Sequence, residues 1–94
     1  MSNPPKQIDG ANVLEWAWSG DKPFGIVMTT DGKVAAEIYG IAICKYENSD
    51  IIYRFSCDFD WETEQDSDYS SIEDAKKYIP AQYQNIEIQW KKSE

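Results

Sequence analysis

An unbroken alternation of acidic residues is the feature of this sequence with the clearest potential for chemistry. Every second position over one short segment carries a carboxyl group: Asp58, Asp60, Glu62, Glu64, Asp66 and Asp68. Because successive side chains of a β-strand point to opposite faces, the spacing predicts six carboxylates on one side of an extended segment, about 6.8 Å apart. Glu73 and Asp74 follow, and no basic residue lies between Asp58 and Asp74.

The net charge of the chain is concentrated in this segment. The 94 residues carry a formal net charge of −8, and the part outside Asp58–Asp74 holds nine acidic and nine basic residues. Neighbouring carboxylates at this spacing repel by roughly 0.6 kcal/mol in water, so the alternation lowers stability, and we expect a function to justify that cost. An acidic surface repels nucleic acid and anionic lipid. We therefore expect a basic protein as partner, with no direct nucleic-acid binding and no membrane association.

Two other chemical uses of these carboxylates compete with docking. Carboxylates two residues apart could act as acid and base in a carboxylate-dependent hydrolase, which we rank lower because a domain this small has little room for a cleft that raises one pKa. Asp58, Asp60 and Glu62 match the first ligand positions of a calcium loop. Thr63 and Tyr69 then stand where that loop needs a glycine and a bidentate glutamate, so no specific metal site is expected.

The remaining residues offer little catalytic chemistry. The chain has no histidine, so the usual neutral-pH base is missing, and its scattered glycines form no phosphate-binding loop. Cys44 and Cys57 are too few for a disulfide framework. Pairing of the strands on either side of Glu47–Asp50 would place Cys44 opposite Tyr53 and Cys57 opposite Gly40. We therefore expect no disulfide, no cofactor and no enzymatic activity.

Alternating and apolar runs predict the elements that position the acidic segment. Strands are expected at Val13–Trp18, Phe24–Thr30, Val34–Tyr46 with a bend at Gly40, and Ile51–Cys57. Asp31-Gly32 predicts a tight hairpin between the second and third of these strands. The acidic alternation is expected as a fifth strand, or its approach, after a bend at Asp58–Asp60.

A helix and a last strand follow the acidic segment. Ser70-Ser71-Ile72-Glu73 matches a capping box, Ile72, Ala75 and Tyr78 or Ile79 would form the buried stripe, and Pro80 ends the helix. Ile86, Ile88 and Trp90 alternate with polar residues as a final strand. The predicted fold class is α+β: an antiparallel β-meander of about five strands, one helix packed across it and a returning C-terminal strand.

The domain organisation expected from the sequence is simple. Residues 1–10 are predicted as a flexible N-terminal arm, residues 11–90 as a single α+β domain and residues 91–94 as a frayed tail. We see neither a signal peptide in the polar start of the chain nor an apolar run of the roughly 20 residues that span a bilayer. A cytoplasmic location is therefore expected.

Docking on a basic partner is the leading functional hypothesis. The predicted partner-binding residues are Asp58, Asp60, Trp61, Glu62, Glu64, Asp66, Asp68, Tyr69, Glu73 and Asp74, with Trp61 and Tyr69 as aromatic anchors. The competing hypothesis is a structural or accessory domain whose charged edge strand provides solubility and prevents aggregation. As a class only, and without a shared motif, a small acidic chain rich in aromatic residues resembles bacterial antitoxin or immunity proteins that block basic nucleases. Trp16, Trp18 and Trp90 are expected in the core.

Overall fold

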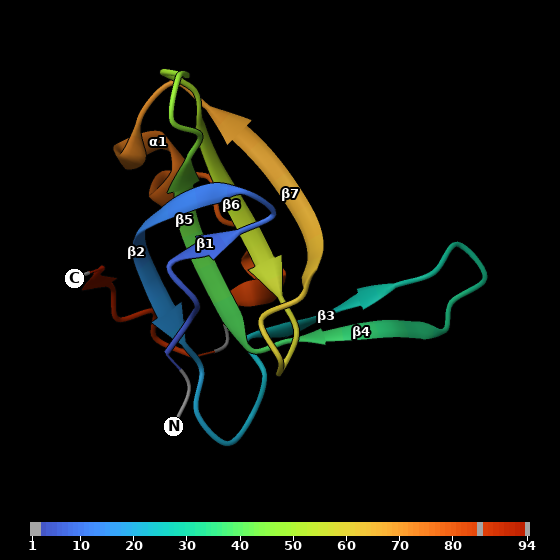
Figure 1. Ribbon diagram of the computed structural model, residues 1–94. Helices are drawn as coiled ribbons and strands as arrows, with labels where there is room; N and C mark the ends of the chain where they lie inside the picture. Colours follow the sequence, from blue (N-terminus) through green and yellow to red (C-terminus); the bar gives the residue numbers. More distant parts are fainter. Residues whose placement is uncertain (1–2, 85, 94) are drawn as a thin grey trace.

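The main feature of the computed structural model, which describes residues 3–84 and 86–93, is a curled antiparallel sheet (Figure 1). Its strands in spatial order are β1 (Gln7–Ile8), β2 (Ala11–Trp18), β5 (Gly40–Lys45), β6 (Ile52–Cys57) and β7 (Thr63–Tyr69), and β8 (Lys91–Lys92) also pairs with β2. The predicted α+β fold with a returning C-terminal strand is confirmed. The predicted register between β5 and β6 is confirmed as well, because Cys44 pairs with Tyr53 and Gly40 with Cys57.

A separate two-stranded hairpin interrupts the order of the main sheet. It consists of β3 (Gly25–Met28) and β4 (Val34–Ile38), and it extends away from the body of the molecule (Figure 1). Gly32 in the turn has a φ of 86°, which suits the glycine that the Asp31-Gly32 signal predicted. The single strand predicted for Val34–Tyr46 is divided at Tyr39, so the bend expected at Gly40 moves the chain from one sheet to another.

The helix α1 (Ile72–Lys77) and the 3₁₀ helix η1 (Ala81–Tyr83) cover the face of the sheet opposite β1. The N-cap is Ser71, whose hydroxyl accepts a hydrogen bond from the amide of Asp74 at 3.1 Å, so the N-cap lies one residue later than the Ser70 of the predicted capping box. Ile79 is buried and Tyr78 is exposed, which resolves the predicted alternative. In the described part of the chain, no helix is long and apolar enough to cross a membrane.

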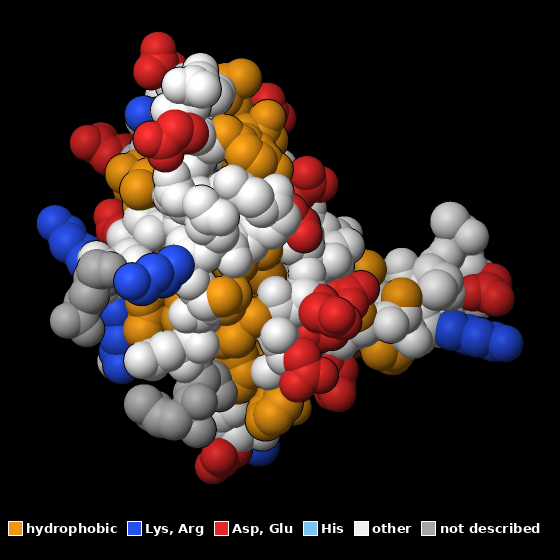
Figure 2. Space-filling model, viewed as in Figure 1, with side chains coloured by type: hydrophobic (Ala, Val, Ile, Leu, Met, Phe, Trp, Pro, Cys, Tyr) orange, Lys and Arg blue, Asp and Glu red, His pale blue; other side chains and the backbone are white. Residues whose placement is uncertain are grey.

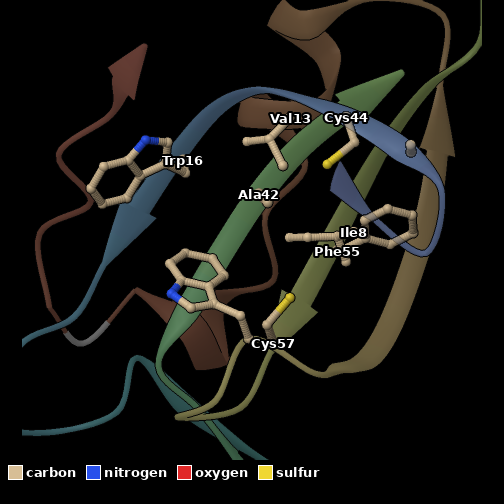
Figure 3. Close-up of a cluster of buried hydrophobic side chains, with 9 residues drawn as sticks. Ile8, Val13, Trp16, Ala42, Cys44, Phe55 and Cys57 are labelled. Carbon is tan, nitrogen blue, oxygen red and sulfur yellow. The ribbon is translucent and has the colours of Figure 1, made fainter. Parts of the chain in front are cut away.

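Two sets of buried side chains hold the sheet, one on each face. The inner face of the curl carries Ile8, Ala11, Val13, Trp16, Ala42, Cys44, Phe55, Cys57 and Trp61 (Figure 3). The helix-covered face carries Ile41 and Ile43 from β5, with Ala75, Ile79 and Tyr83 from the helical segment. Burial of nonpolar surface on both faces gives this six-stranded sheet its main stabilisation.

Arg54 is the buried cation that joins the helix to the sheet. It is 4% exposed, and its Nη1 donates to the carbonyl of Ala75 at 2.7 Å while its guanidinium lies 4.9 Å from the centre of the Tyr69 ring. Burial lowers the pKa of Arg54 from its ordinary value, and nearby Tyr69 opposes that shift. The carbonyl near the negative end of α1 and the face of the ring therefore take the place of a carboxylate partner.

Both ends of the chain take more part in the sheet than the sequence predicted. Gln7–Ile8 lies within the predicted flexible arm, yet it pairs with β2 and Ile8 is buried, because the side chain of Ile8 fills the inner core. Ile86–Trp90, the predicted last strand, is irregular. Pairing with β2 falls instead at Lys91–Lys92, inside the predicted frayed tail. Residues 1, 2 and 94 of the predicted arm and tail lie outside the described residues.

The contact between Gly40 and Trp61 predicts a strong size limit at position 40. A Cβ added to Gly40 would lie 2.5 Å from Cζ3 of Trp61, closer than packed carbon atoms approach. Gly40→Ala should therefore lower the free energy of unfolding by roughly 1–3 kcal/mol, measured by chemical denaturation. The loss should shrink in a Trp61→Leu background, where the ring is absent. An equal loss in both backgrounds would show that the glycine is needed for another reason.

Candidate functional site

The acidic alternation begins in a tight turn rather than in a strand. Asp58 Oδ1 accepts hydrogen bonds from the amides of Asp60 at 2.8 Å and Glu62 at 2.9 Å, and the amide of Asp58 donates to the carbonyl of Glu62 at 2.9 Å. The prediction of six carboxylates on one side of an extended segment is therefore wrong for the first three, which occupy the β6–β7 turn. The reason is local, because the aspartate side chain offers the backbone a turn in place of ladder bonds.

Trp61, which was predicted as a partner-binding anchor, is buried inside the molecule. Its φ of 63° is in the left-handed region, and this conformation turns the indole inward, where it is 8% exposed. The ring meets Trp16 edge to face at a centroid distance of 6.1 Å and Trp18 at 5.4 Å. Trp61 therefore supplies packing energy to the core, and its turn neighbours Phe59 and Asp60 are exposed in its place.

The second half of the alternation lies on β7, at one edge of the sheet. Glu64, Asp66 and Asp68 are exposed. Asp66 and Asp68 share one face of the strand because they are two residues apart in a regularly paired segment, whereas the register with β6 shifts at Glu64. The intervening residues Gln65 and Ser67 are exposed too, so β7 has no buried apolar face between its ends. β7 pairs with β6 alone, and its outer backbone edge makes no sheet contact in the described residues.

The other predicted site residues serve the helix side of β7. The ring of Tyr69 stacks on that of Tyr78 at 6.3 Å and receives the guanidinium of Arg54. Asp74 is occupied at the start of α1, where its carboxylate accepts from the hydroxyl of Ser70 at 3.3 Å. Glu73 is exposed in the first turn of the helix. Tyr69, Glu73 and Asp74 therefore lie beside or within α1 and are not part of the β6–β7 turn.

The carboxylates of the turn and of β7 make no ion pair with any side chain that the structure describes. We call Asp58, Asp60, Glu62, Glu64, Asp66 and Asp68 together the acidic surface. Across residues 3–84 and 86–93 the ion pair found is Lys76–Glu15 at 2.7 Å, which lies elsewhere. Figure 2 shows acidic side chains gathered beside the base of the β3–β4 hairpin without Lys or Arg among them. The acidic surface therefore keeps its negative charge available to an external partner.

Sequence reasoning missed a group of aromatic side chains next to the turn. Tyr39, between β4 and β5, meets Phe59 edge to face at 5.1 Å, and Trp18 lies 5.4 Å from Phe59. Glu37, Tyr39, Asp58, Phe59 and Asp60 line a surface hollow of about 160 Å³. The bend predicted at Gly40 was the available signal, but only the fold shows that the bend brings Tyr39 beside the β6–β7 turn.

The two cysteines are buried on the inner face of the curl and are not bonded to each other (Figure 3). Burial raises the pKa of Cys44 to about 12 and that of Cys57 to about 12. A thiol with such a pKa carries almost no thiolate at neutral pH, and the thiolate is the nucleophile and the metal ligand. No group of three His, Cys, Asp or Glu side chains suited to a metal ion occurs among the residues that the structure describes.

No protein-family model, curated protein or solved structure matches this chain. The function is therefore argued from the geometry and charge of the site.

Neutralising the acidic surface should not weaken the fold. Because these side chains have no cationic partner in the described part of the chain, Glu62→Gln, Glu64→Gln and Asp66→Asn together should leave the denaturation midpoint unchanged or raise it through weaker repulsion. Glu15→Gln is the matched control, since it breaks the Lys76–Glu15 ion pair and should cost about 0.5–1 kcal/mol. A clear loss of stability in the triple variant would mean that these carboxylates make stabilising contacts.

The buried thiols predict a fall in stability at high pH. Both thiols hold their protons more tightly in the folded chain, so their contribution is complete below the ordinary pKa of 9.0 and is lost as the pH rises toward about 12. Native protein at pH 8 should resist alkylation by iodoacetamide, and unfolded protein should react at two sites. The Cys44→Ala variant should show a shallower pH dependence. Rapid alkylation of the native chain would contradict this burial.

Proposed function

We propose that the chain is a non-catalytic binding module that docks a basic protein through the acidic surface. The single observation that carries the proposal is the set of six clustered carboxylates with no internal ion-pair partner among the described residues. A cluster of like charge raises the energy of the free domain and attracts a partner of opposite charge. Complementary charge of this kind mainly increases the rate of association and the choice of partner.

Both halves of the acidic surface are held in place by hydrogen bonds, which supports docking. The turn half is fixed by hydrogen bonds to Asp58 Oδ1, and the strand half lies on the hydrogen-bonded pair β6–β7. A surface held in place before binding loses little conformational entropy when the partner arrives. The acidic surface should therefore act as a fixed row of charges, in contrast to a flexible acidic tail.

Inhibition of a nuclease or toxin is the form of docking that we favour. An enzyme that acts on nucleic acid needs a positively charged surface to hold phosphates. A protein with the opposite charge could cover that surface without imitating the phosphate spacing. We place this activity in the cytoplasm, where two unpaired thiols would remain reduced.

A second candidate function follows from the position of β7. Its outer edge is open, and charged side chains on an open edge discourage pairing with other chains. An accessory domain that uses Glu64, Asp66 and Asp68 only for this purpose would need no basic partner. This candidate predicts that neutralising these three residues increases self-association.

Association kinetics test the docking proposal. A partner captured on the immobilised protein would be purified, and both rate constants would be measured at 50 and 150 mM salt. Asp60→Asn, Glu64→Gln and Asp66→Asn together should slow association by roughly ten-fold or more at low salt, with a smaller effect on dissociation. The control is Asp21→Asn, Asp50→Asn and Glu87→Gln, which removes the same number of exposed charges from the balanced part of the chain.

The association rate of the parent protein should fall as the salt concentration rises. The acidic-surface variant should slow association, and the control variant should not. Association that ignores salt, with the two variants indistinguishable, would remove the docking proposal. Increased light scattering by the first variant would then favour protection of the β7 edge.

A further inference from the structure

The hollow beside the β6–β7 turn combines exposed aromatic surface with negative charge. Phe59 is 61% exposed, and it lines the hollow together with Tyr39 and the acidic residues Glu37, Asp58 and Asp60. An exposed phenylalanine ring in contact with two other aromatic rings is an apolar feature that solubility does not explain. The hollow therefore offers a partner more than charge.

Backbone hydrogen bonds hold both walls of the hollow. The amide of Tyr39 donates to the carbonyl of Cys57 at 2.9 Å, and the carbonyl of Tyr39 accepts from the amide of Ser19 at 2.9 Å. On the other side, the bonds to Asp58 fix the turn that carries Phe59 and Asp60. The backbone that carries these side chains is thus held in place before any ligand arrives.

The size and chemistry of the hollow favour one kind of occupant. Its volume of about 160 Å³ is below the roughly 300–1,000 Å³ of pockets that enclose small-molecule ligands. It is better suited to a single side chain. An arginine side chain combines a flat cation, which stacks on aromatic rings, with a fork of N–H donors that fits carboxylates. A lysine ammonium would also pair with the carboxylates, but it is not planar and would stack less well on the aromatic rings.

The β3–β4 hairpin extends this surface with exposed apolar residues. Ile26 pairs with Glu37 across the hairpin, so these side chains share a face, and Glu37 also lines the hollow. Met28 and Val34 continue the exposed apolar surface toward the tip. A protein segment that placed a side chain in the hollow could therefore lie along the hairpin as well.

We propose that the hollow receives an arginine side chain of the basic partner. The proposal rests on the proposed docking function and names the residue class that the partner must present. Its charge complements Glu37, Asp58 and Asp60, and its guanidinium plane can stack on the exposed ring of Phe59 beside the partly buried ring of Tyr39.

Short peptides test the arginine site without the whole partner. The probes are acetyl-Gly-Gly-Arg-Gly-Gly-amide and the same peptide with lysine or with citrulline, the uncharged isostere of arginine. Titrations would be followed by NMR of backbone amides and aromatic side chains. The arginine peptide should bind weakly, on the order of millimolar, and shift the signals of Tyr39, Phe59 and Asp60. The lysine peptide should bind at least three-fold more weakly and the citrulline peptide at least ten-fold.

Variants locate the binding on the protein. Phe59→Ala and Asp60→Asn should each weaken the arginine peptide at least five-fold, and thermal melting would verify that both variants fold. Ile51→Ala and Asp50→Asn are the controls, because they remove an exposed apolar group and a charge at the opposite end of β6. These controls should leave the affinity within two-fold of the parent value.

The outcomes separate this proposal from the docking function. Equal binding of the three peptides, or shifts confined to β7, would overturn the arginine site. A captured partner whose association still depends on the acidic surface but not on Phe59 would overturn the site and leave the docking function standing. Arginine-specific shifts at Phe59, with no salt-dependent partner, would support the site and contradict the docking function.

Discussion

The packing of Trp61 against Gly40 is the constraint on which both the core and the exposed surface depend. The indole fits because residue 40 has no Cβ, and it closes the end of the inner core beside Cys57. To reach that position the backbone of Trp61 adopts a left-handed conformation that is costly for a bulky residue. Asp58 offsets this cost with two side-chain hydrogen bonds to the turn. Once Trp61 points inward, its neighbours Phe59 and Asp60 are left in solvent.

Rigidity and charge therefore have a common origin in this turn. A loose acidic loop could spread its charges and reduce their repulsion, whereas the β6–β7 turn holds Asp58, Asp60 and Glu62 close together. Repulsion between neighbouring exposed carboxylates is small beside the roughly 5–15 kcal/mol stability of a typical domain. The inner core can therefore hold the turn in place against the repulsion. The same fixed arrangement favours recognition, because a partner need not order it.

Local signals predicted the parts of the fold that depend on neighbouring residues. Asp31-Gly32 indicated a hairpin, and the turn at Glu47–Asp50 set the β5–β6 register. Pairing between β2 and β5 could not be read in this way, because the β3–β4 hairpin separates them in sequence and leaves the main sheet. In the candidate site, alternation correctly predicted an extended segment with Asp66 and Asp68 on one face, but it gave no sign of the register shift at Glu64. It failed at Trp61, where a tertiary contact with Gly40 outweighs the tendency to continue the strand, and it gave no sign that Tyr39 lies beside Phe59.

The division of the acidic surface between a turn and a strand bears on its purpose. Protection of a sheet edge accounts for charges on β7, since that strand pairs with β6 alone among the described strands. It does not account for Asp60 and Glu62, which are exposed in a turn beyond the end of the ladder. Nor does edge protection account for Phe59, because an exposed aromatic ring favours association, which is the opposite of what edge protection requires. Edge protection therefore accounts for the β7 half of the acidic surface alone, whereas the proposed docking would account for both halves and for the aromatic neighbours of the turn.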